Sequence, residues 1–438
     1  MTRPIRAAIV GAGHRALLYA AYAKAHPGEL QITAVADPDP ERVQRTAEEF
    51  HLPESACFAS AEALAAALPR PADVVINGTM DHQHVATALP LLAAGYDMLL
   101  EKPFATDEEE LWKLAAAAKA HGRHVLICHV LRHAPFYSEI RRRVAEGVIG
   151  RLFNLQLAEQ VSFHHTTVSY VRGKHRSKAL CHAGMLLAKC CHDIDLIVWM
   201  NGGSVPRTVA SFGSRSFFRE ENAPHGAGTA CLVDCPPDVE KNCLYSARKH
   251  YLDNPDRWDF YVWAALENVK NPTLADKERL LRDPKNPFGR CVFRHDNDVV
   301  DRQSVAIEFA NGSTATLNMV GGCATGSRSI HLIGERGEIF GKLEDGYFTV
   351  RRIVAGPGKD FSDEVVRVNA DPGDTTGVHG GHGGGEEHLM ADFVRVIRGE
   401  PPSLSTTSLE DSLYGHLLCF AADRAMEERR VIDLPTGP

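Results

Sequence analysis

Short apolar runs alternate with amphipathic segments over the first third of the chain. The apolar runs predict strands, because strands buried on both faces form continuous apolar stretches. Segments with apolar residues three or four positions apart predict the helices between them. The predicted strands lie at 5–10, 31–37, 72–80, 96–104 and 124–132, and the predicted helices at 17–26, 61–68, 84–95 and 107–122. This alternation predicts an α/β fold with a doubly wound parallel sheet, whose ligands bind at the carboxyl ends of the strands.

The pattern changes after residue 150. Alternating apolar and polar residues predict a strand at 152–163, a hairpin at 304–320 around an Asn-Gly turn, and three short strands within 328–353. Residues 183–200 predict one long helix. Residues 378–399 predict a loop rich in His and Gly, followed by an amphipathic helix.

This change divides the 438 residues into two predicted domains. The first, at 1–130, holds the alternating strands and helices. The second, at 131–438, is α+β and holds a mainly antiparallel sheet. Few periodic segments occur between about 213 and 300, and we interpret this stretch as a loop-rich insertion in the second domain.

Composition excludes several classes of protein. A net charge of −8 and a pI of about 6.3 provide no basic surface for nucleic acid. No apolar segment is long and uncharged enough to span a membrane. The first apolar stretch is one strand long and ends in a Gly-rich turn, so we interpret it as folded structure and expect a cytoplasmic protein. In a reducing compartment, the 11 cysteines are thiols or metal ligands.

The first predicted strand ends in GAGHRA (11–16). Gly11 allows a tight turn, and Gly13 lets the backbone approach a pyrophosphate, as in dinucleotide-binding folds. Asp37 ends the second predicted strand, where a carboxylate binds a ribose 2′-hydroxyl and repels a 2′-phosphate. The motif therefore favours NAD over NADP, although an ordinary strand-turn-helix with an Asp at a strand end is the alternative.

Polar residues follow the later strands of the predicted sheet. Asn77, His82, Glu101, Lys102 and Arg132 all lie at predicted carboxyl ends, so we expect them at the cofactor edge. Taken alone, the Glu-Lys-Pro of LLEKPF (99–104) is equally typical of a solvated loop. In this context it places a charged pair where a nicotinamide ring and its substrate would meet.

The helix at 183–200 carries a second set of titratable residues. Lys189 and His192 are three positions apart and share a face, with Asp195 a turn further on. A histidine has an ordinary pKa of about 6.5 and a lysine one of about 10.4. We therefore favour His192 as general base and Lys102 as hydrogen-bond partner of the reacting hydroxyl. A buried structural histidine is the alternative for His192.

Three cysteines lie close together in the predicted insertion. Cys231, Cys235 and Cys243 could hold a structural zinc, with Cys291 or His295 as fourth ligand. The spacing is not a standard zinc pair, so free thiols or a disulfide are alternatives.

The His/Gly loop offers polar groups to a ligand. Its glycines allow close approach of the backbone, and His379, His382 and Glu386 suit sugar hydroxyls. A flexible loop without such a role and a His-rich metal site are the alternatives.

These motifs together resemble the glucose-fructose oxidoreductase / inositol dehydrogenase (Gfo/Idh/MocA) family. The resemblance rests on the Gly turn, on NGTMDHQH (77–84), on Glu101-Lys102-Pro103 and on HDID (192–195), and it extends over nearly the whole chain. It implies a Rossmann domain followed by an α+β domain with a large open sheet, and a homo-oligomer, either a dimer or a tetramer. One departure is that Ala188 stands where inositol dehydrogenase-like members carry an Asp four residues before the His.

The resemblance implies the roles of the site residues. The cofactor-binding residues are Gly11, Gly13, His14, Arg15, Asp37, Asn77, Thr79, His82, Glu101, Lys102 and Arg132; the substrate-binding residues are Tyr137, Lys189, His192, His382 and Glu386; and Lys102 and His192 are catalytic.

We therefore predict an NAD-dependent oxidoreductase that acts on a secondary hydroxyl of a small-molecule carbohydrate, either a sugar, a glycoside or a cyclic polyol. A redox-neutral glycosidase, which oxidises, eliminates and then reduces again, is the alternative among enzymes. A non-catalytic NAD-binding sensor is the alternative from another class, and Ala188 is the reason to consider it.

Overall fold

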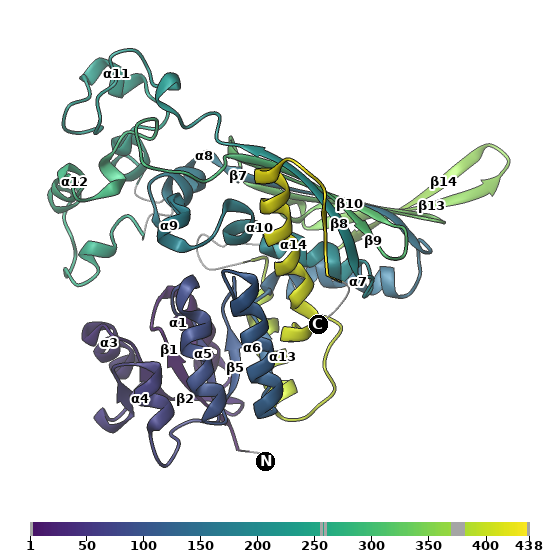
Figure 1. Cartoon of the computed structure of the whole chain (residues 1–438), viewed down its shortest axis with the longest axis horizontal. Coiled ribbons are helices and arrows are strands. Elements are labelled where there is room, and N and C mark those ends of the chain that lie inside the picture. The colour runs from purple at the N-terminus through teal and green to yellow at the C-terminus, as the bar shows by residue number, and fades with distance from the viewer. Residues whose placement is uncertain (1–2, 255–256, 258–260, 369–381, 436–438) are drawn as a thin grey trace.

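The computed structural model describes residues 3–254, 257, 261–368 and 382–435. Two sheets organise the chain, one in the N-terminal third and one in the remainder (Figure 1). Among the described residues, no helix is both long enough and apolar enough to cross a membrane.

The N-terminal sheet has six parallel strands in the order β3-β2-β1-β4-β5-β6. Its strands are β1 (Ile5–Val10), β2 (Leu30–Ala36), β3 (Cys57–Phe58), β4 (Val74–Asn77), β5 (Asp97–Leu100) and β6 (Val125–Ile127). Its helices are α1 (His14–Ala20), α2 (Tyr22–Ala25), α3 (Pro40–Phe50), α4 (Ala61–Ala66), α5 (His84–Ala93) and α6 (Glu108–His121). The predicted doubly wound parallel sheet is confirmed.

Two elements of this sheet differ from the prediction. The sequence did not predict α3, although Asp39 caps its start by accepting N–H bonds from Glu41 and Arg42, and Pro40 occupies the first helical position. The last strand ends at Ile127, not at residue 132. A 3₁₀ turn, η3 (Val130–His133), replaces its predicted second half.

The second sheet has nine strands in the order β14-β13-β12-β11-β7-β10-β9-β8-β15. Only β7 and β10 pair in parallel, so the sheet is mainly antiparallel as predicted. The strands are β7 (Leu152–Ser162), β8 (Pro206–Ser214), β9 (Arg302–Phe309), β10 (Thr314–Cys323), β11 (Ser327–Gly334), β12 (Gly337–Lys342), β13 (Tyr347–Gly356), β14 (Lys359–Arg367) and β15 (Ile432–Asp433). The predicted hairpin is β9 and β10, joined at Asn311-Gly312 with Gly312 at a φ of +82°.

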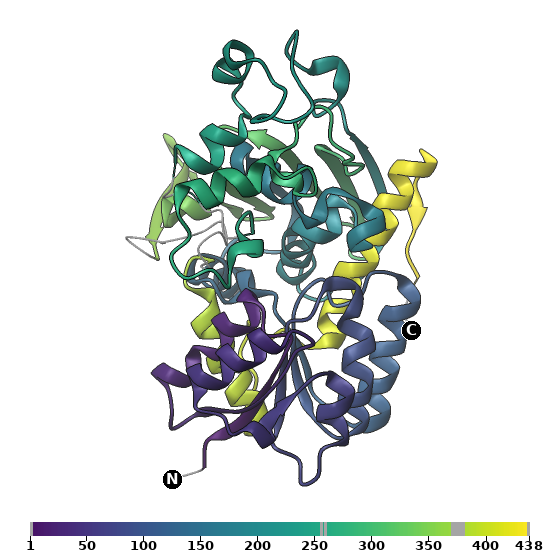
Figure 2. The ribbon, with the colours of Figure 1, turned by 90° about the vertical axis from the view of Figure 1, so that its left-hand side faces the viewer.

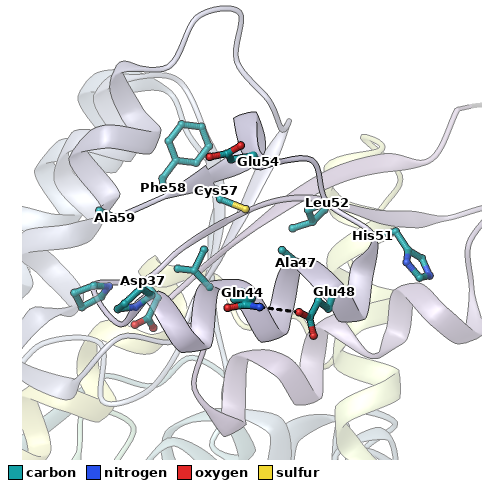
Figure 3. A pocket seen from close by; sticks show the side chains of 13 residues that line it. Asp37, Gln44, Ala47, Glu48, His51, Leu52, Glu54, Cys57, Phe58 and Ala59 are labelled. Atoms are coloured by element: carbon teal, nitrogen blue, oxygen red, sulfur yellow. Dashed lines mark hydrogen bonds between the residues drawn. The ribbon is translucent and has the colours of Figure 1, made fainter. Parts of the chain in front are cut away.

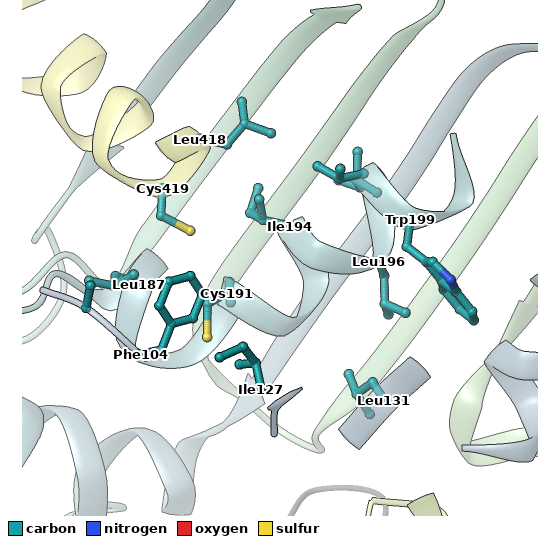
Figure 4. Close-up of a cluster of buried hydrophobic side chains, with 14 of the residues drawn as sticks. Phe104, Ile127, Leu131, Leu187, Cys191, Ile194, Leu196, Trp199, Leu418 and Cys419 are labelled. Carbon is teal, nitrogen blue, oxygen red and sulfur yellow. The ribbon is translucent and has the colours of Figure 1, made fainter. Parts of the chain in front are cut away.

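Helices cover one face of this sheet (Figure 1). They include α10 (Met185–Met200) and α14 (Leu409–Glu428). The helix α7 (Pro135–Ala145) connects the two sheets, and the short helices α8 (Phe163–His165) and α9 (Lys178–Cys181) lie between β7 and α10. Every residue of α10 is buried. Figure 4 shows its apolar side chains between Leu418 and Cys419 of α14 on one side and Phe104, Ile127 and Leu131 of the N-terminal part on the other. The charged residues of α10 therefore need partners inside the protein.

A C-terminal helix completes the N-terminal part of the molecule. The side chains of α13 (Gly385–Ile397), including Leu389 and Phe393, join Ile9 and Ala16 in one apolar cluster. The described residues between β8 and β9 form α11 (Pro237–Asn242), α12 (Leu274–Arg282) and short turns around two small apolar clusters, which also include Val168 and Val171. In Figure 2 the upper loops of this stretch lie at the end of the molecule opposite the N-terminus, whereas its lower part reaches α3, where Glu267 pairs with Arg42 (3.3 Å).

Candidate active site

The Gly turn after β1 has the backbone that the motif predicts. Gly11 has a φ of +77°, and a Cβ on it would lie 2.7 Å from the backbone nitrogen of Thr79, so a larger residue would not fit there. A Cβ on Gly13 would meet nothing within 4 Å. The turn therefore leaves open space beside its backbone, where a phosphate group can approach.

Asp37 follows β2 next to this turn. Its carboxylate accepts N–H bonds from Ala12 (2.7 Å) and Asp39 (2.8 Å). It also stands at one end of a cavity of about 890 Å³ between α3 and β3, lined among others by Gln44, Leu52 and Phe58 (Figure 3). Lys102 and His192 do not line this cavity. The cavity therefore lies beside Asp37 and apart from Lys102 and His192.

Glu101 is held by three donors after β5. Its carboxylate accepts bonds from the Arg15 Nε (3.1 Å), the Tyr19 hydroxyl (2.9 Å) and the backbone N–H of Lys102 (2.7 Å). Burial alone would raise the pKa of the Glu101 carboxyl, but the charges of Arg15 and Lys102 hold it below its ordinary value. The Arg15 Nη1 is buried without a hydrogen-bond partner. Tyr19 belongs to this network, and the sequence pattern did not identify it.

Further predicted cofactor residues lie at the end of β4, just after it and at the start of α1. The Asn77 amide donates to Thr87 (2.9 Å), and its oxygen accepts the Thr79 hydroxyl (3.0 Å). The Nδ1 of His82 is buried without a partner. Burial lowers the pKa of His14, the residue that follows Gly13.

Lys102 and His192 come together at the first two turns of α10. The Lys102 ammonium donates to the backbone oxygen of Ala188 (3.5 Å), one helical turn before His192. Both ring nitrogens of His192 are buried without a hydrogen-bond partner. Burial first, and then the charge of Lys102, place the pKa of His192 well below its ordinary value. The imidazole is therefore neutral at neutral pH and able to accept a proton.

The other charges of the first half of α10 are paired. Lys189 lies 3.3 Å from Glu159, whose other oxygen lies 2.6 Å from Arg328, and Arg328 also binds Asp193 (3.1 Å). We call Glu159, Lys189, Asp193 and Arg328 the buried quartet. Lys189 was predicted to bind substrate, but its ammonium forms an ion pair with Glu159 inside the protein.

Arg132 and Tyr137 also have structural surroundings. The Arg132 guanidinium makes two bonds to Asp195, at 2.7 and 2.5 Å, and one to the backbone oxygen of Thr406. It lines a separate cavity of about 710 Å³ that includes Trp199 but not Lys102. Tyr137 is 1% exposed and stacks edge-on with Phe136 in the core. The predicted roles of Arg132 in cofactor binding and of Tyr137 in substrate binding remain predictions.

The His/Gly loop reaches the site through Arg15. The Nδ1 of His382 lies 2.5 Å from Glu386, which also lies 3.7 Å from Arg15. The His382 ring lies 5.6 Å from the His192 ring, and burial lowers its pKa to about 4. The predicted His379 lies outside the described residues.

Sequence patterns missed a third group near Lys102. Asp81 lies 3.6 Å from both Lys174 and His175. These two residues belong to a segment after β7 whose sequence shows no helical or strand periodicity. Burial would raise the pKa of Asp81, but the charge of Lys174 and the other neighbouring cations lower it. The ring of His175 stacks on Tyr170. Their only common signal in the sequence is polar residues in a stretch that forms no regular strand or helix.

The predicted zinc site finds no support in the described part of the chain. Cys231, Cys235, Cys243 and Cys291 line one cavity of about 20 Å³, but no group of three or more His, Cys, Asp or Glu residues there could hold a metal ion. The Cys231 sulfur instead lies 3.5 Å from Arg172. All four cysteines are free, and burial raises the pKa of the thiols of Cys235, Cys243 and Cys291. We therefore correct the zinc prediction to a cluster of free thiols.

Comparisons with known proteins agree with the two-sheet architecture. A family model described as "Oxidoreductase family, NAD-binding Rossmann fold" matches residues 5–129. A second, described as "Oxidoreductase family, C-terminal alpha/beta domain", matches residues 141–434.

The individual proteins similar to this chain share about a quarter of its residues over the aligned parts. A protein of Bacillus subtilis (strain 168) named as an oxidoreductase, YteT, is 24% identical over 373 residues, which cover 83% of this chain and 82% of the relative. Inositol 2-dehydrogenase of Corynebacterium glutamicum (strain R) is 25% identical over 210 residues, which cover 47% of this chain and 56% of the relative.

Among solved structures, a levoglucosan dehydrogenase in complex with NADH and levoglucosan matches with a TM-score of 0.69 at 16% identity. The match covers 99% of this chain and all of that one, and at this identity it shows a shared fold. The two matching family models span most of the sequence, and the chain therefore belongs to the Gfo/Idh/MocA oxidoreductase family.

Proposed function

We propose that this protein is an NAD-dependent dehydrogenase that oxidises a secondary hydroxyl of a sugar, glycoside or cyclic polyol. The observation that supports this most is the position of the Lys102 ammonium, bound one helical turn before a buried, neutral His192 whose ring nitrogens both lack a hydrogen-bond partner. Buried polar atoms are normally hydrogen-bonded, and exceptions are often groups that act on a ligand.

The Gly turn and Asp37 would hold the cofactor. Gly13 leaves the space for a pyrophosphate, the orphan Nη1 of Arg15 offers a further donor, and the Asp37 carboxylate disfavours the extra phosphate of NADP. Bound NAD supplies the acceptor for a hydride. Glu101 fixes Arg15 and the backbone of Lys102, so that the Lys102 side chain projects from a rigid edge.

His192 and Lys102 would handle the hydroxyl of the substrate. The Lys102 ammonium donates a hydrogen bond to the hydroxyl oxygen and stabilises its developing negative charge. A ring nitrogen of His192 takes the hydroxyl proton as the C–H hydrogen leaves as hydride. A positioned general base of this kind contributes on the order of 10²- to 10⁴-fold to the rate.

The substrate class follows from relatives and from polar groups at the site. The inositol and levoglucosan dehydrogenases are named for polyhydroxylated rings. Here His382 with Glu386 and His175 with Asp81 offer hydrogen-bonding groups near the two reacting residues. Such groups discriminate between hydroxyl patterns of a ring.

We also propose that the chain forms a homo-oligomer through the outer face of the nine-stranded sheet. Along β9 every second side chain is exposed, and Phe212 of the neighbouring β8 is 75% exposed. Sedimentation of the purified protein tests this, because a monomer at micromolar concentration would contradict it. A cytoplasmic location remains a prediction.

An absorbance assay for NADH tests the proposed function. The purified protein is mixed with a panel of inositols, levoglucosan and aryl glycosides, first without and then with added NAD. Continuous NADH formation that requires added NAD is the expected result. Release of the aglycone without net NADH would show the redox-neutral glycosidase instead. NAD binding without turnover of any compound in the panel would favour the sensor.

A further inference from the structure

The position four residues before His192 has no side chain that can hold the imidazole. Ala188 carries only a methyl group, and its backbone oxygen accepts the Lys102 ammonium. A histidine base works well when its second ring nitrogen is fixed by an acceptor, because this selects the tautomer and stabilises the imidazolium that forms. The structure must supply this partner from another element.

His129, two residues after the end of β6, lies beside His192. The two rings meet edge to face, with centroids 5.6 Å apart and planes at 77°. His129 is 1% exposed, and both of its ring nitrogens lack a hydrogen-bond partner. Its Nε2 lies 3.8 Å from an oxygen of Asp195, so a movement of about 1 Å would close a hydrogen bond.

Asp195 is well placed to end such a chain. Arg132 fixes its carboxylate through two bonds, so its position does not depend on His129. The other neighbours of His129 are His416 of α14, whose Nε2 accepts the backbone N–H of Phe104, and the charges of Arg132, Lys102 and Glu101. The pKa of His129 lies well below its ordinary value, mainly through burial, so the ring is neutral and can accept one hydrogen bond while it donates another.

We infer that His129 is a positioning residue that links His192 to Asp195, in place of an acceptor on α10. The His192 ring nitrogen that faces the core, its inner nitrogen, donates its N–H to one nitrogen of His129. The other nitrogen of His129 donates its N–H to Asp195. The hydroxyl proton of the substrate ends on the outer nitrogen of His192, and no proton needs to leave the pair. Asp195 then stabilises the positive charge of His192 through His129. This inference rests on the proposed function.

His382 is the competing partner, because its ring also lies 5.6 Å from His192. It is already bound to Glu386, and Glu386 lies beside Arg15 at the Gly turn. His382 therefore lies on the side of His192 that faces the Gly turn, and His129 lies on the side that faces the core. Substitutions at the two positions separate these roles.

The first test needs neither cofactor nor substrate. Protein labelled with ¹⁵N-histidine is studied by long-range ¹H–¹⁵N spectra, and the His192 signals are assigned by their loss in His192→Asn. We expect one locked neutral tautomer in the wild type, and averaging of the two ring-nitrogen shifts in both His129→Phe and His129→Asn. His133→Phe is the matched control, because His133 is also a buried histidine of this segment and no ring contact joins it to His192 in the described structure. Unchanged His192 shifts in both His129 variants would overturn the inference.

The second test uses rescue. With levoglucosan or an inositol and NAD, His129→Phe should lower kcat by about 10- to 100-fold while NAD binding is unchanged. Adding Ala188→Asp to His129→Phe should raise kcat at least about tenfold above that of His129→Phe alone. The reason is that residues four apart share a helix face, so the new carboxylate reaches His192. An equal loss in His382→Asn with no rescue by Ala188→Asp would assign the role to His382. If neither compound is turned over, the proposed function is at fault and the spectra alone decide on His129.

Discussion

The buried quartet and the pair formed by His129 and His192 involve the same helix, yet they are built in opposite ways. In the quartet every charged side chain lies within 3.3 Å of an opposite charge. In the histidine pair no ring nitrogen has a hydrogen-bond partner. Because both regions are buried, the difference does not come from solvent. The paired groups hold α10 against the sheet, whereas the unpaired ring nitrogens of His192 keep their bonding capacity for a ligand and for a positioning residue.

The largest expected effect is the loss of activity on substitution of His192, the member of the histidine pair that lies on α10. His192→Asn removes the proton acceptor and should lower kcat by about 10²- to 10⁴-fold with NAD binding retained. Steady-state kinetics and a fluorescence titration of NAD measure the two quantities. The control is Lys113→Met on the exposed side of α6, which should leave both unchanged. A loss below about tenfold in His192→Asn would remove this residue from the mechanism.

A substitution in the buried quartet should instead lower the free energy of unfolding. Arg328→Met leaves Glu159 and Asp193 with only Lys189 between them, and breaking a buried charge pair costs about 3–5 kcal/mol of unfolding free energy. Urea unfolding measures the loss. The matched control is Arg351→Met, which breaks an exposed pair with Asp363 and should cost about 0–1 kcal/mol. Equal losses in the two variants would mean that burial does not distinguish the quartet.

Lys102→Met should produce a smaller kinetic effect than His192→Asn. It removes a hydrogen bond to the hydroxyl oxygen but leaves the base, so we expect a loss in kcat of about 10²-fold. NAD binding should be retained. A loss larger than that of His192→Asn would indicate that Lys102, and not His192, is the proton acceptor.

Acid should weaken the protein gradually through its buried neutral histidines. Burial lowers the pKa of His382 to about 4 and that of His250 to about 3, below the ordinary value of about 6.5. The unfolded chain therefore binds more protons than the folded one below about pH 6.5, and stability falls as the pH decreases from there towards the folded values. Each such group contributes up to about 1.4 kcal/mol per pH unit. The melting temperature should drop between about pH 7 and about pH 5, and a constant value would contradict this.

The sequence predicted much of the fold and the centre of the candidate site. Continuous apolar runs and helical spacing gave the five longer strands of the first sheet, and Gly11, Gly13 and Asp37 marked one end of the site. The spacing on α10 placed Lys189 and His192 on one helix. It could not show that Lys189 is neutralised, because its partner Glu159 lies on a strand in a different part of the chain.

What the sequence determined by itself was local: the periods of strands and helices, the turn chemistry of glycines, and which residue types follow each strand. What only the tertiary structure decided was pairing. Arg328 meets Asp193 across 135 residues because β11 lies next to β7, one of the strands on which α10 packs. His129 meets His192 because the chain turns after β6 into η3, which packs beside α10. Periodicity carries no information on such distant pairs, since they depend on strand order and on helix packing. For this reason only the folded chain could decide between the alternatives for the cysteines and identify the neighbours of His192.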